Sequence, residues 1–224
     1  MSSLHIRHAR ATESRTIAQL LITAFRGRAM NDAIFPDHLR GDTGASEELE
    51  LRAGNLARSI GNNNHHHIVV ADDADEVVGY AEWVDGEDPV VDMTPEEREK
   101  KRAERIEKLP KSLDLEAFDR AMAEIVPLFD MLKEALGKEG YENSWSLNAI
   151  AVHPAHQRKG IGKMLTRWGL ERAEKEHKNV HFLSSPSGAN LYHAMGFEEV
   201  GSKEILGGME YAFIKRVTHN RVNN

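Results

Sequence analysis

The chain contains no cysteine, and this absence excludes several kinds of chemistry. Without thiols there is no disulfide bond, no thiolate-coordinated zinc site and no cysteine nucleophile. The lack of cysteine also fits a reducing compartment, so we expect a cytoplasmic protein.

Long apolar segments and a surplus of basic residues are also missing. No run of eighteen or more apolar residues occurs, and residues 1–15 lack the apolar core of a secretory signal, so no membrane association is expected. The formal net charge is −7, whereas proteins that bind nucleic acid usually carry a basic face. We therefore expect no nucleic-acid partner, while a positively charged amine remains a plausible substrate.

The order of predicted elements is that of a mixed α/β protein. A length of 224 residues is enough for one well-packed core, so residues 1–224 are predicted to form a single domain. Apolar alternation and helical spacing indicate a central mixed sheet flanked by helices. We predict strands at 5–10, 68–71, 77–84, 145–152, 180–183, 199–200 and 209–217, helices at 46–60, 161–177 and 186–195 and near residues 15–25, and a loop at 36–44.

Residues 85–143 form a charged, helical insertion in this pattern. Its second half has apolar residues at alternating three- and four-residue steps, which places them on one side of a helix that Pro127 is expected to kink. We expect this apolar stripe to pack within the chain; the alternative is a second subunit, which would make it a homodimer interface. The stripe consists of Leu115, Phe118, Met122, Ile125, Phe129, Leu132 and Leu136.

The most informative segment joins the strand at 145–152 to the helix that begins near Ile161. It reads QRKGIG at residues 157–162. Glycines let the backbone approach a ligand closely, and the first turn of a helix offers unpaired N–H groups and a favourable dipole for an anion. The glycine spacing is neither that of a nucleotide P-loop nor that of a dinucleotide fingerprint. The segment therefore indicates a different kind of pyrophosphate site.

Two motifs in this order resemble those of the GNAT N-acetyltransferase superfamily. The first is LNAIAVHP at 147–154 followed by QRKGIG, and the second is LYHAMGF at 191–197. The resemblance extends over nearly the whole order of elements. It implies a GNAT-like α/β (α+β) fold, with a central mixed, mostly antiparallel sheet flanked by helices and a helical insertion. It also implies that acetyl-CoA is the cosubstrate, with no metal.

The resemblance assigns roles to individual residues. Tyr192 matches the tyrosine that donates a proton to the departing thiolate. Ser185 stands where the family often has an asparagine that touches the cofactor. The serine side chain could still form a hydrogen bond, but it reaches less far. The backbone near Ile150, Ala151 and Val152 would pair with the pantetheine arm. The pyrophosphate would be bound by Gln157, Arg158, Lys159, Gly160, Ile161, Gly162 and Lys163.

The general base is less clearly marked than the proton donor. A protonated amine must lose a proton before it attacks a thioester. Glu82, on the strand before the insertion, is the first candidate, although a solvent-facing strand residue would look the same. Asn148 lies where some relatives carry an acid, and an amide cannot act as a base. His153 and His193 are more simply explained as structural.

Three adjacent histidines at 65–67 invite a metal assignment. Neighbouring side chains on an extended chain point in opposite directions, so three in a row seldom converge on one ion. We therefore expect a solvated loop here and no metal site.

The leading functional hypothesis is transfer of acetyl from acetyl-CoA to a primary amine of a small molecule, with the insertion forming part of the acceptor pocket. A protein lysine or N-terminal amine is the first alternative. The second is a non-catalytic acetyl-CoA-binding module that uses the apolar stripe as a partner surface. Neither the acceptor nor the oligomeric state follows from the sequence.

Overall fold

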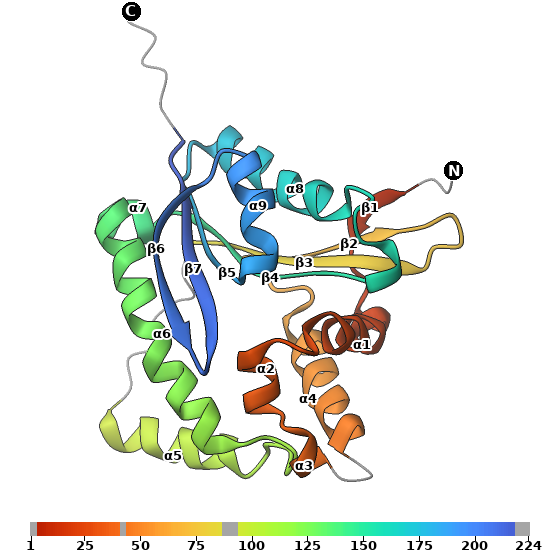
Figure 1. Ribbon diagram of the computed structural model, residues 1–224, viewed down its shortest axis with the longest axis vertical. Coiled ribbons are helices and arrows are strands. Elements are labelled where there is room, and N and C mark those ends of the chain that lie inside the picture. Colours follow the sequence, from red (N-terminus) through yellow and green to blue (C-terminus); the bar gives the residue numbers. More distant parts are fainter. Residues whose placement is uncertain (1–3, 41–43, 87–93, 218–224) are drawn as a thin grey trace, which may run out of the picture.

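The computed structural model describes residues 4–40, 44–86 and 94–217, which form a seven-stranded sheet with helices on both faces (Figure 1). The strand order is β1-β2-β3-β4-β5-β7-β6. Among the described strands the β4–β5 pair is parallel and the other pairs are antiparallel. The prediction of a mixed, mostly antiparallel sheet is confirmed. The strands are β1 (His5–His8), β2 (His65–Ala71), β3 (Val77–Asp85), β4 (Trp145–Val152), β5 (Val180–Ser184), β6 (Glu198–Ile205) and β7 (Gly208–Lys215).

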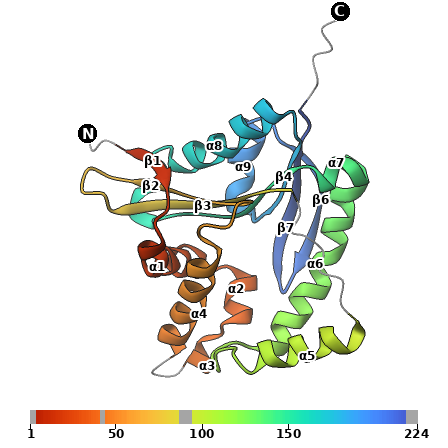
Figure 2. The same ribbon diagram turned by 180° about the vertical axis from the view of Figure 1, so that it is seen from behind.

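The helices cover the two faces of the sheet in separate groups, as Figures 1 and 2 show from opposite sides. On one face, α8 and α9 share a core with Trp83 and Phe213. On the other, α1 and α4 cover Val69 and Tyr80. The helices are α1 (Ser14–Phe25), α2 (Ala29–Ile34), α3 (Asp37–Arg40), α4 (Gly44–Ser59), α5 (Pro95–Ile106), α6 (Leu115–Leu136), α7 (Lys138–Glu142), α8 (Ile161–Glu176) and α9 (Pro186–Ala194), with short 3-10 helices η1 (Ala11–Glu13) and η2 (Pro154–His156).

Helix α8 packs unusually close to β3. A Cβ atom placed on Gly169 would lie 2.2 Å from the ring of Trp83, a distance that no side chain tolerates. The Trp83 indole nitrogen, which is fully buried, donates a hydrogen bond to the backbone oxygen of Leu165 at 3.2 Å. A buried indole needs such a partner. The small residue and the indole hydrogen bond together fix the position of α8, and therefore of the loop that precedes it.

Helix α6 carries the predicted apolar stripe and packs on β6 and β7. Its buried residues Ala121, Leu128 and Leu132 share a cluster with Ala212 and Ile214 of the sheet. Intramolecular packing is thus confirmed, and the helix continues through Pro127.

The buried side of α6 differs from the predicted stripe in one respect. Met122 is 41% exposed, because the contact with the sheet is centred on Ala121 and Leu128. The small side chain of Ala121 lets the helix approach the strands closely. The predicted stripe consisted of larger apolar residues and did not include Ala121.

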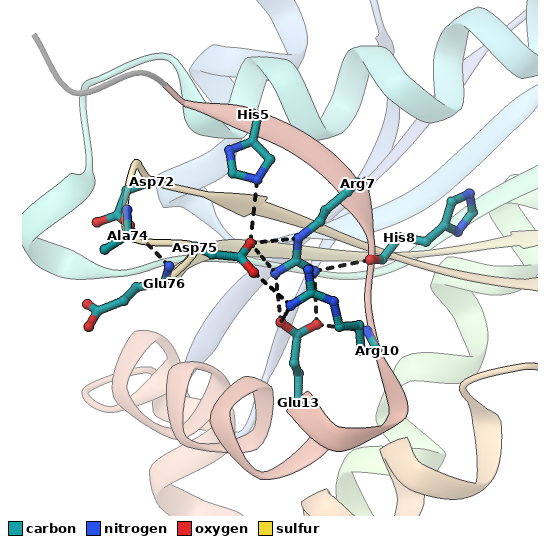
Figure 3. Close-up of polar contacts among 9 residues, drawn as sticks. All are labelled: His5, Arg7, His8, Arg10, Glu13, Asp72, Ala74, Asp75 and Glu76. Atoms are coloured by element: carbon teal, nitrogen blue, oxygen red, sulfur yellow. Dashed lines mark hydrogen bonds and ion pairs between the residues drawn. The ribbon is translucent and has the colours of Figure 1, made fainter.

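An ion-pair network joins the first strand to the β2–β3 turn (Figure 3). Arg7 donates two hydrogen bonds to the carboxylate of Glu13, at 2.9 and 2.7 Å, and a further one from Nε to Asp75 Oδ1 at 3.0 Å. Arg10 Nη1 donates to the other Asp75 oxygen at 2.7 Å. These contacts hold the pKa of Asp75 at about 2, well below its usual value. The network holds the exposed β2–β3 turn against η1.

Two sequence-based expectations about loops are wrong. His65–His67 was predicted to be a solvated loop, but these residues form the first part of β2 and pair with β3. Pairing with β3 satisfies the backbone groups of these residues. The ring of His66 also stacks on Trp145, with 4.9 Å between ring centroids. The predicted loop at 36–44 contains the helix α3, and its residues 41–43 lie outside the described ranges.

Candidate active site

Strands β4 and β5 separate after a short parallel pairing. Their register contains two pairs, Trp145 with Val180 and Ser146 with His181, although β4 continues to Val152. Beyond Ser146, the edge of β4 that faces β5 therefore has no partner among the described strands. Backbone N–H and C=O groups require hydrogen-bond partners, so this open edge is suited to an extended ligand that pairs as an added strand.

A cleft of about 820 Å³ lies at this separation. Four segments far apart in the sequence line it: the end of α1 with the turn after it, strand β4, the loop and first turn of α8, and the end of β5 with α9. Among the described residues, the lining consists of residues 24–28, 147–152, 157–158, 160–163, 183–185, 187–188 and 190–192.

A β-bulge shapes the β4 wall of the cleft. In the β3–β4 register, Glu82 lies opposite Ala149 and Trp83 opposite Leu147, so Asn148 is an extra residue without a partner. Bulges bend a strand and increase its twist, which fits the divergence of β4 from β5. The side chain of Asn148 is exposed and lines the cleft. The apolar run at 145–152 predicted a regular strand and gave no sign of this bulge.

The glycine-containing loop has the geometry of an anion site. Arg158 and Gly160 adopt left-handed backbone conformations, with φ of +63° and +83°, and α8 begins directly afterwards at Ile161. The first N–H groups of a helix have no acceptor within the helix, and its dipole favours negative charge nearby. The open end of α8 thus faces the cleft, and Arg158 and Lys163 at its lining add positive charge.

Tyr192 lies at the inner wall of this cleft. Its side chain is 3% exposed and packs against the rings of Phe182, Phe197 and Phe213. Burial raises the pKa of its hydroxyl to about 12, and the nearby positive charge of Arg28 opposes part of that shift. At neutral pH Tyr192 is therefore fully protonated and able to donate a hydrogen bond or a proton.

Gly188 allows the tyrosine to occupy this place. A Cβ atom on Gly188 would lie 2.7 Å from Ser184 Oγ and 2.8 Å from the Tyr192 ring. Ser185 also lines the cleft, and its hydroxyl is 2.9 Å from Ser187 Oγ. The start of α9 thus presents two serine hydroxyls beside the buried tyrosine.

Two of the predicted site residues do not line the cleft. Lys159 is exposed in the loop, and Glu82 lies one strand away, on β3. The Glu82 carboxylate is hydrogen-bonded to His65 Nδ1 at 2.9 Å. Its opposite residue on β4, Ala149, does line the cleft. A role for Glu82 as the base stays a prediction, and it would require a water chain to reach the cleft.

Another wall of the cleft comes from the end of α1 and was missed in the sequence. Phe25, Arg26 and Arg28 line the cleft there, and the Arg28 guanidinium lies 5.0 Å from the centre of the Phe25 ring. Gly27 between them has φ of +83°, so the chain turns sharply after α1. No local motif marks these residues, because their position depends on the packing of α1 across β3 and β4.

The charges in the cleft are of one sign. Its described lining contains Arg26, Arg28, Arg158 and Lys163 and no aspartate or glutamate. Burial raises the pKa of the nearby Glu210 on β7, while Arg28 lowers it. Tyr192 on α9 and Glu210 on β7 are therefore both within reach of the Arg28 charge.

The helical insertion was expected to form part of the acceptor pocket. Within the described residues 94–143, none lines the cleft. Helix α6 instead packs on β6 and β7 and contacts α2. Residues 87–93 lie outside the described part of the chain.

Comparison with known proteins relates one region of the chain to a family. A family model described as an acetyltransferase (GNAT) domain matches residues 131–199. The resemblance predicted from residues 157–162 and 191–197 is thus confirmed, and with it the acetyltransferase class. The matched region holds β4, α8, β5 and α9, which are three of the four walls of the cleft.

Solved structures share the fold of this chain over nearly its whole length. A histone acetyltransferase-related protein from Corynebacterium glutamicum is 18% identical, with a TM-score of 0.62 over 99% of this chain and 100% of that one. The PaiA N-acetyltransferase of Thermoplasma acidophilum, in complex with coenzyme A, is 11% identical, with a TM-score of 0.55 over 96% and 99% of the two chains. These likenesses confirm the predicted GNAT-like fold.

A curated relative is similar over a shorter region. An acetyltransferase from Stachybotrys chartarum is 26% identical over 91 residues, which are 40% of this chain and 40% of the relative. The similarity thus spans less than half of the relative's length. Among the described residues, no helix has the length and apolar character needed to cross a bilayer.

Proposed function

We propose that this chain transfers the acetyl group of acetyl-CoA to a primary amine, and that the cleft between β4 and β5 is the place of reaction. The observation that carries the proposal is the convergence of three features on one cleft. These are an open strand edge, a helix N-terminus with left-handed turns, and a buried tyrosine that is protonated at neutral pH. An extended thioester with a pyrophosphate at one end requires all three.

The residues present fit acetyl-CoA along this path. The N–H groups of the first turn of α8, from Gly160 to Lys163, would hold the pyrophosphate together with the side chains of Gln157 and Arg158. The β4 edge at Ile150, Ala151 and Val152 would pair with the amides of the pantetheine arm. Ser185 would contribute one hydroxyl, with a shorter reach than an amide side chain. Lys159 would act at longer range through its charge.

In the proposed reaction, the acceptor nitrogen attacks the thioester carbonyl carbon and forms the amide bond. The carbon–sulfur bond breaks, and Tyr192 donates its proton to the departing sulfur. The amine proton leaves toward the base, for which Glu82 is the candidate by way of water. The products are the acetylated amine and free coenzyme A.

The positive charge of the cleft lining affects which acceptor amines can bind there. Its described lining carries Arg28, whose charge acts on Tyr192, together with Arg26 and no acidic side chain. Such a wall favours an amine that also bears a carboxylate or another anionic group, and it disfavours polyamines. Small amines of this kind, such as amino acids, are thus the first acceptors to try. A protein acceptor, at a lysine or an N-terminal amine, remains the alternative.

The test is acceptor-dependent release of free thiol from acetyl-CoA. The purified chain is incubated with amino acids, polyamines, aminoglycosides and short peptides, and coenzyme A is followed with a thiol reagent. Loss of the proton donor in Tyr192→Phe should lower kcat roughly 10²-fold, the size typical of general acid catalysis. Tyr211→Phe is the matched control, because Tyr211 is half-buried on β7 and does not line the cleft.

Each outcome has a definite meaning. An unchanged kcat in Tyr192→Phe would remove the tyrosine from the mechanism. Thermal stabilisation by acetyl-CoA without turnover on any acceptor would favour the non-catalytic binding module. No stabilisation by acetyl-CoA would contradict the cofactor assignment itself.

A further inference from the structure

Two histidines of β2 and one glutamate of β3 converge on the face of the sheet that α4 covers. His65 and His67 are two residues apart on β2, so their side chains project from the same face. Glu82 is the direct cross-strand partner of His67 in the β2–β3 register. His66 projects to the other face of the sheet, as the alternation of side chains predicts. His65 and His67 instead share a face with Glu82 of the neighbouring strand.

The donor atoms of this trio are close enough for one ion. A nitrogen of each histidine and a carboxylate oxygen of Glu82 all lie within 4.8 Å of one another. The two imidazole rings are nearly parallel, at 16° with 6.2 Å between centroids. His65 Nδ1 lies 2.9 Å from Glu82 Oε1. Small side-chain adjustments would bring the three donors to the ligand spacing of a tetrahedral ion, which needs bonds of about 2.0–2.2 Å.

The surroundings hold His67 through both of its ring nitrogens, and a bound ion would replace one of these two contacts. His67 Nδ1 is 2.8 Å from the Tyr80 hydroxyl, and its Nε2 is 2.8 Å from Ser59 Oγ at the end of α4. A metal-binding histidine is usually held through its other ring nitrogen by such a partner. Tyr80 is fully buried and can keep its contact, while Ser59 is half-buried and can rotate away.

Two of the three side chains are partly exposed, so an ion from solvent can reach the trio. The side chains of His65 and Glu82 are 14% and 20% exposed, whereas His67 as a whole is 3% exposed. The ligands are therefore shielded on the α4 side and open to solvent toward His65. This combination restricts their movement and still leaves an entry path.

We propose that His65, His67 and Glu82 bind a divalent transition-metal ion, with zinc as the best match. Two imidazoles and one carboxylate form a donor set that zinc accepts, with a fourth position left for water or an added ligand. The ion would link β2 to β3 and hold Glu82 on its own face of the sheet. This site lies outside the lining of the cleft but uses Glu82, the candidate base of the proposed reaction. A Glu82 carboxylate bound to zinc could not also accept the amine proton, whereas zinc binding itself does not require acetyl transfer.

Zinc titration tests this site directly. The full chain is freed of metal with a chelator and titrated with zinc chloride in a calorimeter, and its thermal unfolding is followed with and without zinc. We expect one ion per chain and a higher Tm. His65→Ala and Glu82→Gln should each weaken zinc binding at least tenfold, because each removes a ligand.

The matched control is His66→Asn, which changes the adjacent histidine on the opposite face and should leave the zinc affinity unchanged. Circular dichroism of each variant verifies folding, and Glu82→Gln preserves side-chain shape if His65→Ala proves unstable. Absence of zinc binding by the unaltered chain would overturn the proposal. So would binding that is equally tight in His65→Ala, Glu82→Gln and His66→Asn, since the ion would then lie at other histidines.

Discussion

The two sides of the cleft are built in different ways. The β4–α8 side is one continuous segment, residues 147–163, and it offers mainly backbone groups: a free strand edge and the first turn of a helix. The wall at the end of α1 offers side chains, with Phe25, Arg26 and Arg28 as its main groups. A backbone-built wall suits a cosubstrate with a repeating amide arm and a pyrophosphate. A wall of side chains can change with the acceptor while the rest of the fold stays the same.

Of these two walls, the backbone-built one is expected to show the larger effect when it is broken. Valine in place of Gly160 would be forced into a left-handed conformation, at φ near +83°. Such a conformation costs about 1–2 kcal/mol for a residue with a side chain, and more for a β-branched one. Gly160→Val should thus weaken acetyl-CoA binding roughly tenfold, measured by calorimetry.

Gly207→Val separates this local effect from general strain. Gly207 also has φ of +80°, lies in the β6–β7 turn and does not line the cleft. It should lower the Tm and leave acetyl-CoA affinity unchanged. Equal loss of affinity in both variants would mean that the loop has no specific part in binding.

A smaller effect is expected from the side-chain wall. Arg28→Ala removes a positive charge that acts on Tyr192 and should raise the KM of an anionic acceptor about fivefold, the effect of an exposed ion pair worth about 1 kcal/mol. The KM of acetyl-CoA should stay within about twofold, because the proposed pyrophosphate site lies at the other wall. Steady-state kinetics with both substrates varied provides the measurement.

Arg216→Ala is the control for this change, since Arg216 is exposed and outside the cleft lining. If Arg28→Ala raised the two KM values equally, the division between a cosubstrate wall and an acceptor wall would fail.

The smallest effect is expected outside both walls, at the Asp75 network. The pKa of Asp75 is lowered from 3.8 to about 2 by Arg10 and Arg7. A lowered pKa stabilises the folded chain above the unfolded value, and this contribution disappears as the pH falls from about 4 to about 2. Asp75→Asn should therefore lower the free energy of unfolding slightly at pH 7, with kcat unchanged.

Urea unfolding at several pH values gives the sign of this prediction. The difference in free energy of unfolding between the unaltered chain and Asp75→Asn should become smaller as the pH falls. It should vanish once Asp75 is protonated in both the folded and the unfolded chain. A difference that grew at low pH would contradict the assigned ion pairs.

The sequence predicted the backbone-built wall well because its signals are local. Strand β4 begins and ends at the predicted residues, and α8 begins at Ile161 as predicted, since the glycines and the helix start lie next to each other in the chain. The cleft gathers Ile150, Val152 and Tyr192 from separate elements, as the family resemblance implied. Their functional roles remain predictions.

The side-chain wall could not be predicted in the same way. Arg28 reaches the cleft only because α1 packs across β3 and β4, a contact with no local signature. The bulge at Asn148 depends on the register with β3, and the strand at His65–His67 depends on cross-strand partners such as Glu82. Long-range pairing decided these features, and histidine has only a weak preference for strands.

Amide hydrogen exchange with and without acetyl-CoA tests whether the cosubstrate binds between β4 and β5. We expect slower exchange at Ile150–Val152 of β4 and at the N–H groups of residues 160–163, with little change at residues 24–28 until an acceptor is added. Protection confined to other elements, or none at saturating acetyl-CoA, would contradict a cosubstrate site between β4 and β5.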